Sequence, residues 1–183
     1  MIPVLETDRL ILRGQRLQDF PAQLALWTDP RTMRYFGGHT YTEEDVWQRF
    51  LRNHGQWSLF GFGNWAIEEK ASRCTIGTIG FFLGKRPFDG PWRDDPEAGW
   101  AIAPDSQGQG FAREAMAAAI GWADANMTAS RTWCMINQGN EISVKVATRA
   151  GYRAFGTADY KGSPMQIFMR SRAPFALPAA PQS

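Results

Sequence analysis

The sequence predicts one α/β domain with a mixed, mostly antiparallel sheet flanked by helices. Its 183 residues suit a single domain. Short apolar strands joined by a polar turn occupy the first half of the chain. A strand–glycine loop–helix–strand–helix order occupies residues 97–150. A helix that connects two strands of one sheet makes those strands parallel, so we expect one parallel pair inside the sheet.

The first elements expected are a strand over residues 7–13 and a helix over residues 18–27. Asp19 precedes a proline by two positions, which is typical of an N-cap followed by proline in the first turn. The helix should end at Asp29, because the residue before a proline avoids helical geometry. A second, short helix is expected over residues 31–35.

A longer helix should begin at Thr42, whose hydroxyl can cap it while acidic residues fill the first turn. Gly55 predicts its end, since glycine is the common C-terminal stop. Apolar residues at helical spacing predict its buried face: Val46, Trp47, Phe50 and Leu51.

An antiparallel pair of strands is expected over residues 64–68 and 75–82. Residues 84–96 then interrupt the pattern with prolines, charges and the aromatics Phe88 and Trp92. Long loops mounted on rigid strands often build functional sites. The alternative is a surface loop folded back on its own aromatics.

The chain is organised around a glycine-spaced loop, residues 107–112, between a strand at 98–103 and a helix at 112–123. The first N–H groups of a helix have no partner within it, and the helix dipole adds positive charge there. Glycines let a phosphate approach the backbone closely. No Lys-Ser or Lys-Thr follows the last glycine, so this is not a P-loop. The loop alone indicates either an anion site or an ordinary turn.

The last third of the chain predicts a helix over residues 140–150, with Asn140 as its N-cap and Gly151 as its stop. Further strands are expected over residues 131–136, 152–155 and 165–169. We expect the domain to cover residues 1–172. The proline- and alanine-rich residues 173–183 read as a loosely held tail.

Composition narrows the class of protein. A net charge of +2 without charged blocks gives no case for nucleic-acid binding. Cys74 and Cys134 stand in no metal or redox spacing, which predicts free thiols in a reducing cytoplasm. His39 and His54 lack partners at ligand spacing, so no metal is expected. No apolar run approaches the ~20 residues of a membrane span, and no secretory signal is evident. Eight Trp and twelve Phe indicate an aromatic core or an aromatic-lined pocket.

Taken together, these segments resemble the GNAT superfamily of acyl-CoA-dependent N-acyltransferases. The resemblance is strongest to the branch that includes the ribosomal-protein N-terminal acetyltransferases. Residues 5–13 are similar to that branch's first strand, and residues 97–112 fit the superfamily's cofactor motif, Gln/Arg-x-x-Gly-x-Gly/Ala. Asn140 and Ser143, followed by Gly151-Tyr152, are similar to its Asn-x-x-Ser helix.

The resemblance implies acetyl-CoA as cosubstrate, with no metal. The parallel central strands would splay, and the pantetheine arm would enter the gap beside the backbone of Trp100, Ala101 and Ile102. The pyrophosphate would lie on the loop, and the cap of the later helix would be a further contact. The cofactor residues implied are Trp100, Ala101, Ile102, Gln107, Gly108, Gln109, Gly110, Phe111, Ala112, Asn140 and Ser143.

The implied reaction is direct attack of a primary amine on the thioester carbonyl in a ternary complex. Glu97 matches a frequent general base of the superfamily, and a backbone N–H near Trp100 could polarise the carbonyl. Many relatives use a Tyr to protonate the leaving thiolate. Here Tyr152 lies at the far end of the helix, so Ser143 is the candidate for that role. The alternatives are an exposed strand-end carboxylate or a salt bridge for Glu97, and a hydroxyl that bonds only to the backbone for Ser143.

The sequence indicates least about the amine that accepts the acetyl group. Aromatic and polar side chains of the early helices and the 84–96 loop are candidates for its walls: Tyr35, Phe36, His39, Trp92 and Trp47. A small-molecule amine and a protein N-terminus both remain open, in a monomer or a homodimer. The alternatives are an aminoglycoside-type acetyltransferase and a GNAT-fold regulatory module that binds acyl-CoA without turnover.

Overall fold

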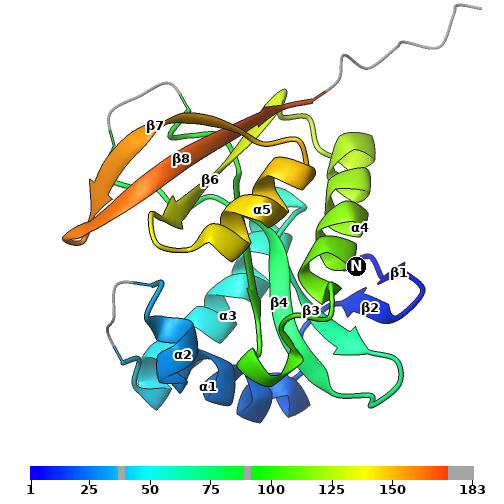
Figure 1. Cartoon of the computed structure of the whole chain (residues 1–183). Coiled ribbons are helices and arrows are strands. Elements are labelled where there is room, and N and C mark those ends of the chain that lie inside the picture. Colours follow the sequence, from blue (N-terminus) through cyan, green and yellow to red (C-terminus); the bar gives the residue numbers. More distant parts are fainter. Residues whose placement is uncertain (37–39, 89–91, 173–183) are drawn as a thin grey trace, which may run out of the picture.

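An eight-stranded sheet forms the centre of the computed structural model, which describes residues 1–36, 40–88 and 92–172 (Figure 1). The strands are β1 (Leu5–Glu6), β2 (Leu10–Arg13), β3 (Asn64–Glu69), β4 (Thr75–Phe82), β5 (Glu97–Ile102), β6 (Arg131–Asn137), β7 (Arg153–Tyr160) and β8 (Ser163–Ser171). The helices are α1 (Phe20–Thr28), α2 (Pro30–Met33), α3 (Glu43–Phe60), α4 (Phe111–Asn126) and α5 (Glu141–Arg149). The predicted mixed α/β class is confirmed.

The sheet has the order β1-β2-β3-β4-β5-β6-β8-β7, and every neighbouring pair is antiparallel except β5 and β6. Those two parallel strands are paired at Glu97 and Trp133, and the Trp133 N–H donates to the Pro96 carbonyl at 3.1 Å. Beyond this point they separate, and Figure 1 shows β6, β7 and β8 turned away from β3 and β4. The expected parallel, splayed strands are therefore present.

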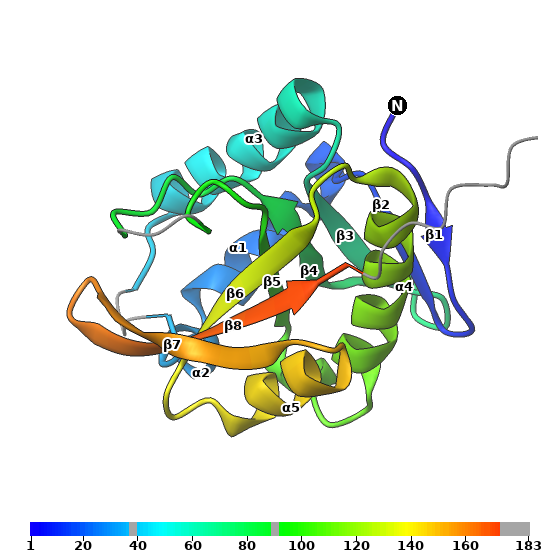
Figure 2. The same cartoon turned by 90° about the horizontal axis from the view of Figure 1, so that it is seen from above.

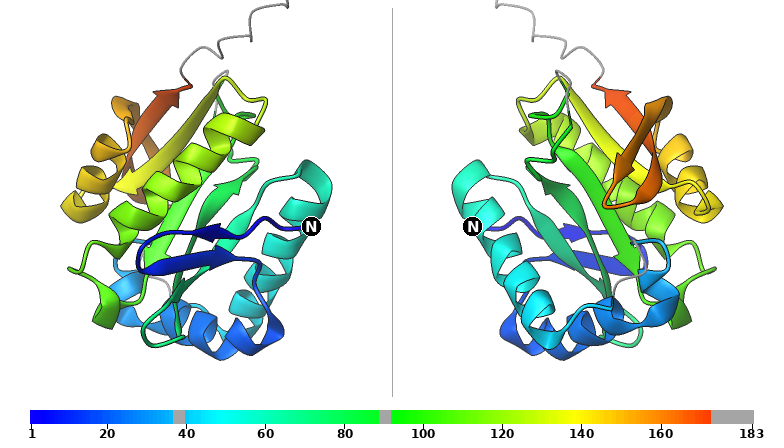
Figure 3. Two further views of the ribbon diagram at one scale, coloured as in Figure 1. Left: turned by 90° about the vertical axis from the view of Figure 1, so that its right-hand side faces the viewer. Right: turned by 90° about the vertical axis from the view of Figure 1, so that its left-hand side faces the viewer.

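Helices cover both faces of the sheet. Consecutive residues of a strand point to opposite faces, and on β5 Ala101 packs with Leu26 and Trp27 while Ile102 packs with Phe111 and other side chains of α4. Seen from above, the strands run between α3 on one side and α4 on the other (Figure 2). The side views show α1 at the lower end of the molecule and α3 rising from there along one side (Figure 3).

Helix α3 is longer than predicted. It continues through Gly55 to Phe60 and ends at Gly61, which has a φ of +72° and an N–H that donates to the Trp57 carbonyl at 3.1 Å. A mid-helix glycine costs only ~1 kcal/mol, and the packing of α3 outweighs that. The extra turns bury Trp57, whereas Leu51 is 46% exposed, so its assignment to the buried face was wrong. The Thr42 cap is confirmed by its bond from the Asp45 N–H.

The Asp19 side chain does not cap α1, in contrast to the prediction. Its carboxylate instead accepts both terminal nitrogens of Arg13, at 2.7 and 2.8 Å, and the hydroxyl of Thr75 at 2.7 Å. Arg13 also donates to Glu68 at 2.6 Å. Asp19 is 5% exposed, so this ion pair is a buried tie between β2, β3, β4 and the start of α1.

No helix among the residues that the structure describes has the length and apolar content to cross a membrane.

Candidate functional site

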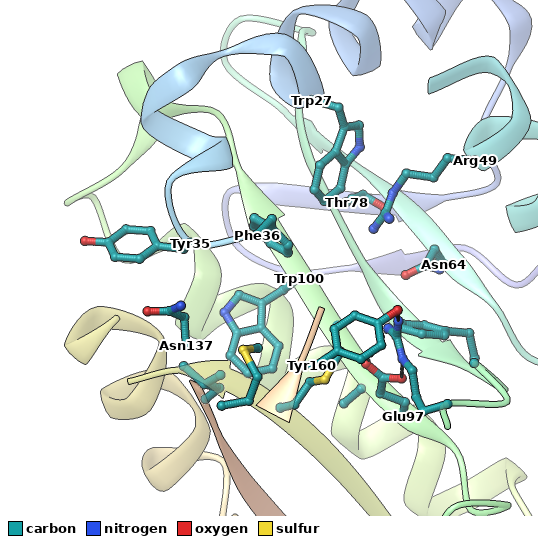
Figure 4. A pocket seen from close by; sticks show the side chains of 18 of the residues that line it. Trp27, Tyr35, Phe36, Arg49, Asn64, Thr78, Glu97, Trp100, Asn137 and Tyr160 are labelled. Carbon is teal, nitrogen blue, oxygen red and sulfur yellow. Dashed lines mark hydrogen bonds and ion pairs between the residues drawn. The ribbon is translucent and has the colours of Figure 1, made fainter. Parts of the chain in front are cut away.

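A cleft of about 610 Å³ opens where β5 and β6 separate. Its floor includes Gly99 and Trp100 on β5 and Met135 and Asn137 on β6, so the gap in the sheet is part of the cleft. Helix α3, the segment after α2 and the turn between β7 and β8 form its walls (Figure 4). The size is that of a small-ligand site.

Strands β5 and β6 form a fork, which is closed at Glu97 and Trp133, where they pair, and open beyond. Glu97 therefore lies at the closed end of this fork, and it is 4% exposed. Arg86, from the 84–96 loop, donates to both of its oxygens at 2.8 and 2.9 Å, and to the Tyr160 hydroxyl at 2.6 Å. Burial raises the pKa of Glu97 above its usual value, while the hydrogen bonds and charge of Arg86 and the charges of Arg49 and Arg52 act to lower it. The carboxyl is therefore a buried but paired acid.

Asn140 and Ser143 both line the cleft from the start of α5. The Asn140 side chain accepts the Ser143 N–H at 3.1 Å, which confirms the predicted N-cap. The Ser143 hydroxyl has no hydrogen-bond partner among the described residues, so it is available to a ligand. Tyr152 does not line the cleft. It is 1% exposed, and its hydroxyl lies 2.7 Å from Thr132.

The glycine loop lies beyond the other end of β5. Gly108 and Gly110 have φ values of +79° and +82°, which is the conformation that only glycine adopts freely. The Gln107 side chain donates to the Ile102 carbonyl at 2.9 Å and closes the turn onto β5. Arg9, one residue before β2, donates to the Gln109 carbonyl at 2.9 Å, and its charge is paired with Glu114 in the first turn of α4 at 2.6 Å. The backbone of the two glycines and the start of α4 thus give the loop the geometry in which helix N–H groups can bind an anion.

The remaining predicted cofactor residues are placed around this loop and strand. Ala101 and Phe111 are buried and point into the two cores of the fold, so they offer only backbone to a ligand. Ile102 is buried in the same way, whereas Gln109 is exposed and Ala112 is partly exposed.

The predicted acceptor residues divide into two groups. Tyr35 and Phe36 line the cleft. Trp92 does not; it is 8% exposed and packs on Trp133, with ring centroids 4.8 Å apart. Trp47 is also absent from the lining and stacks on Phe50. His39 lies outside the described residues.

Seven charged or phenolic residues among those described in the lining were missed from the sequence: Tyr41, Asp45, Arg49, Arg52, Arg86, Tyr160 and Lys161. A signal for two of them was present, because α3 carries a polar stripe at helical spacing that faces the cleft: Gln48, Arg49, Arg52, Asn53 and Gln56. No local pattern indicated that Arg86 would reach Glu97.

Comparison with known proteins agrees with this geometry. The family described as "Acetyltransferase (GNAT) domain" matches residues 9–153. The uncharacterized N-acetyltransferase YoaA of Bacillus subtilis is 27% identical over 157 residues, 85% of this chain and 86% of YoaA. A putative GNAT-family acetyltransferase from Bordetella pertussis superposes with a TM-score of 0.82 at 30% identity, over 92% of this chain and 99% of that one. The ribosomal L7/L12 acetyltransferase RimL, solved in complex with CoA, shares the fold with a TM-score of 0.74 at 18% identity, over 92% and 98% of the two chains.

Proposed function

The chain belongs to the GNAT family of acetyltransferases, and on that premise we propose that it moves an acetyl group from acetyl-CoA to a primary amine by direct attack in a ternary complex. The observation that carries the proposal is the fork between β5 and β6, with the glycine loop at one end and a buried carboxyl at the other. A cofactor bound at the loop would extend along β5 into the cleft and meet the amine beside Glu97.

We propose that the N–H groups of residues 107–112 bind the pyrophosphate, supported by the positive φ of both glycines and by the position of the loop at the start of α4. The pantetheine arm would lie along Trp100 and Ile102, reaching the fork. Asn140 and Ser143 would flank the thioester from α5. The CoA complex of RimL, which shares this fold, supports CoA as the ligand class.

We propose Glu97 as the base. A carboxylate that accepts a bidentate arginine keeps further lone pairs, so one oxygen can still take a proton from the ammonium through a water. The free amine then attacks the thioester carbon, with the Trp100 N–H opposite the developing oxyanion. The C–S bond breaks, the nitrogen gives its second proton to the departing thiolate, and the Ser143 hydroxyl donates a hydrogen bond to that sulfur, so that CoA leaves as the thiol. A serine in the role that many relatives give to a tyrosine also supports membership of the ribosomal-protein acetyltransferase branch.

The acceptor proposed is a small-molecule amine or a protein N-terminus. Tyr35 and Phe36 would form part of its wall, as both line the cleft. We place the reaction in the cytoplasm, which the two free thiols Cys74 and Cys134 support.

The test is an acetyl-CoA titration by calorimetry together with a thiol-release assay over a panel of amines. Binding and turnover with at least one amine support the proposal. Binding without turnover for every amine would instead favour a regulatory acyl-CoA-binding module. No binding of acetyl-CoA would contradict both readings.

A further inference from the structure

The described lining of the cleft carries more positive than negative charge. Its cationic side chains are Arg49, Arg52, Arg86 and Lys161, and its acidic ones are Asp45 and Glu97. Arg86 already neutralises Glu97 with a bidentate pair. Asp45 is engaged at the start of α3, where it accepts the N–H and the hydroxyl of Thr42. The remaining balance favours an anion.

Arg49 is the most informative of these residues. It enters the cleft from α3, with its guanidinium 3.8 Å from the ring centre of Trp27 (Figure 4). Among the described residues, its buried Nε has no hydrogen-bond partner. A guanidinium presents five N–H donors, and a buried donor without an acceptor is unfavourable. Stacking on Trp27 holds the group in place without supplying that acceptor.

The charged groups around Arg49 also leave its positive charge without a paired carboxylate among the described residues. Burial lowers the pKa of Arg49 to about 10, and the like charges of Arg52 and Arg86 act in the same direction. Tyr41 and Glu97 face it as well and act to raise that pKa. At neutral pH the guanidinium therefore remains charged, and an oxyanion from outside the chain would relieve the repulsion between the three arginines.

The phosphates of CoA do not account for these arginines. The proposed pyrophosphate loop follows the end of β5, whereas Arg86 bonds Glu97 at its beginning. Five residue steps of strand separate the two ends by roughly 17 Å. Residues 107–112 are not among the described residues that line the cleft. The arginines thus belong to the acceptor half of the site.

We propose that the acceptor is a primary amine that also carries an oxyanion, a carboxylate or a phosphate-like group, held by Arg49 and Arg52. This inference rests on the proposed acetyl transfer and names its substrate class. The amine of such a molecule would point toward Glu97 and Trp100, while the planar guanidinium groups bind the oxyanion in bidentate fashion. Polyamines and other polycations would meet like charge on the same wall.

The first experiment compares acceptors matched in shape. Acetyl transfer from acetyl-CoA is measured with L-alanine and L-phenylalanine, with their amides, with aminoethylphosphonic acid and with spermidine. The amine of an amino-acid amide is less basic than that of the acid, so a larger free-amine fraction favours the amide. We expect KM for the better oxyanion-bearing acceptor to be lower than for its neutral counterpart by about tenfold or more. The carboxylate and phosphonate arms tell the two sources of oxyanion apart.

The second experiment removes the charges. Arg49→Gln and Arg52→Gln should each raise KM for the preferred acceptor about tenfold and leave the Kd of acetyl-CoA unchanged. Arg49→Lys keeps the positive charge but loses the planar guanidinium, so its KM for the preferred acceptor should lie between those of the wild type and Arg49→Gln. Arg153→Gln, at an exposed position of β7 outside the cleft lining, is the matched control and should change neither constant. Because Arg52 is exposed, its variant tests the proposal even if Arg49 variants fold poorly.

The outcomes separate the two proposals. Equal KM values for acids and amides, or a preference for spermidine, would overturn the oxyanion inference and leave acetyl transfer standing. An oxyanion preference that survives both glutamine variants would likewise overturn it. No transfer to any amine would overturn the proposed function, and this inference with it.

Discussion

Arg86 binds both oxygens of Glu97, at 2.8 and 2.9 Å, from the loop that precedes β5, 11 residues earlier in the chain. The same guanidinium donates to Tyr160 and lies 4.7 Å from its ring centre. One loop residue thereby opposes the effect of burial on the pKa of Glu97 and ties β5 to the β7–β8 hairpin.

Replacing Arg86 should change the pH dependence of catalysis. In Arg86→Gln, burial still raises the pKa of Glu97, but the opposing hydrogen bonds and charge are lost. The pKa should therefore rise further. A base works in its deprotonated form, so the acidic limb of log kcat/KM against pH should move to higher pH. Arg93→Gln, an exposed change in the same loop, should leave the limb in place. An unshifted limb in Arg86→Gln would show that Glu97 is not the base.

Replacing Asp19 should lower the free energy of unfolding, and the loss should be larger at neutral pH than at acidic pH. Burial acts to raise the pKa of Asp19, but hydrogen bonds from Arg13, Arg16 and Thr75 more than offset this and hold it below its usual value. A depressed carboxyl pKa contributes stability above the unfolded pKa, which is lost as pH falls through the folded one. Asp19→Asn should therefore cost about 3 kcal/mol at pH 7, and this cost should shrink as the pH falls below the unfolded pKa of 3.8.

Urea unfolding of the wild type and Asp19→Asn at several pH values measures this difference. Asp94→Asn serves as the control, since its partner Lys85 and its own side chain are both about two-thirds exposed, at 65% and 68%. It should be indistinguishable from wild type. A constant difference from pH 7 down to pH 3 would contradict the assigned linkage.

The two glycines of the loop should be needed for the cofactor. A side chain at Gly110 would be strained by its φ of +82°, and the space beside it is open except for Arg9, 3.5 Å from the position of an added Cβ. Gly110→Ala should therefore distort the loop and weaken acetyl-CoA binding about tenfold. Gly61→Ala, at the C-terminal end of α3 with a φ of +72°, carries the same strain outside both the loop and the cleft lining. It should lower Tm without changing Kd, and equal effects on Kd would refute the role of the loop.

Two substitutions at the start of α5 should have different effects, one mainly on stability and the other mainly on turnover. Asn140→Ala removes a cap and should destabilise the protein by ~1 kcal/mol, raising KM for acetyl-CoA as well. Ser143→Ala removes a hydroxyl that no described side chain uses, so Tm should stay constant while kcat falls about tenfold. Thermal melting and steady-state kinetics measure both effects. Normal turnover in Ser143→Ala would end its proposed role.

Local patterns were sufficient for most of the fold. The Thr42 and Asn140 caps, the β4 strand and the parallel pair followed from residues close together in sequence, and all are confirmed. The wrong end of α3 has a tertiary cause, because Trp57 packs on Trp65 and holds the helix past Gly55.

The site was harder to predict, because its residues meet through long-range contacts. Asp19 looked like a cap, yet Arg13 and Thr75 reach it from other elements. Arg86 comes to Glu97 from a loop without a motif, and Trp92 is buried against Trp133 instead of lining the cleft. Side-chain partners of this kind depend on how elements pack, and spacing along the chain does not encode them.

The fork between β5 and β6 has a consequence for the tendency of the protein to aggregate. A sheet normally has unpaired backbone only at its two outer margins, here β1 and β7. The separation beyond Glu97 and Trp133 creates two inner margins as well. Protein without cofactor would thus present strand edges in the middle of the sheet, where another chain could add a strand. Acetyl-CoA in the gap would cover them, so saturating cofactor should delay aggregation on heating more than its effect on Tm alone explains.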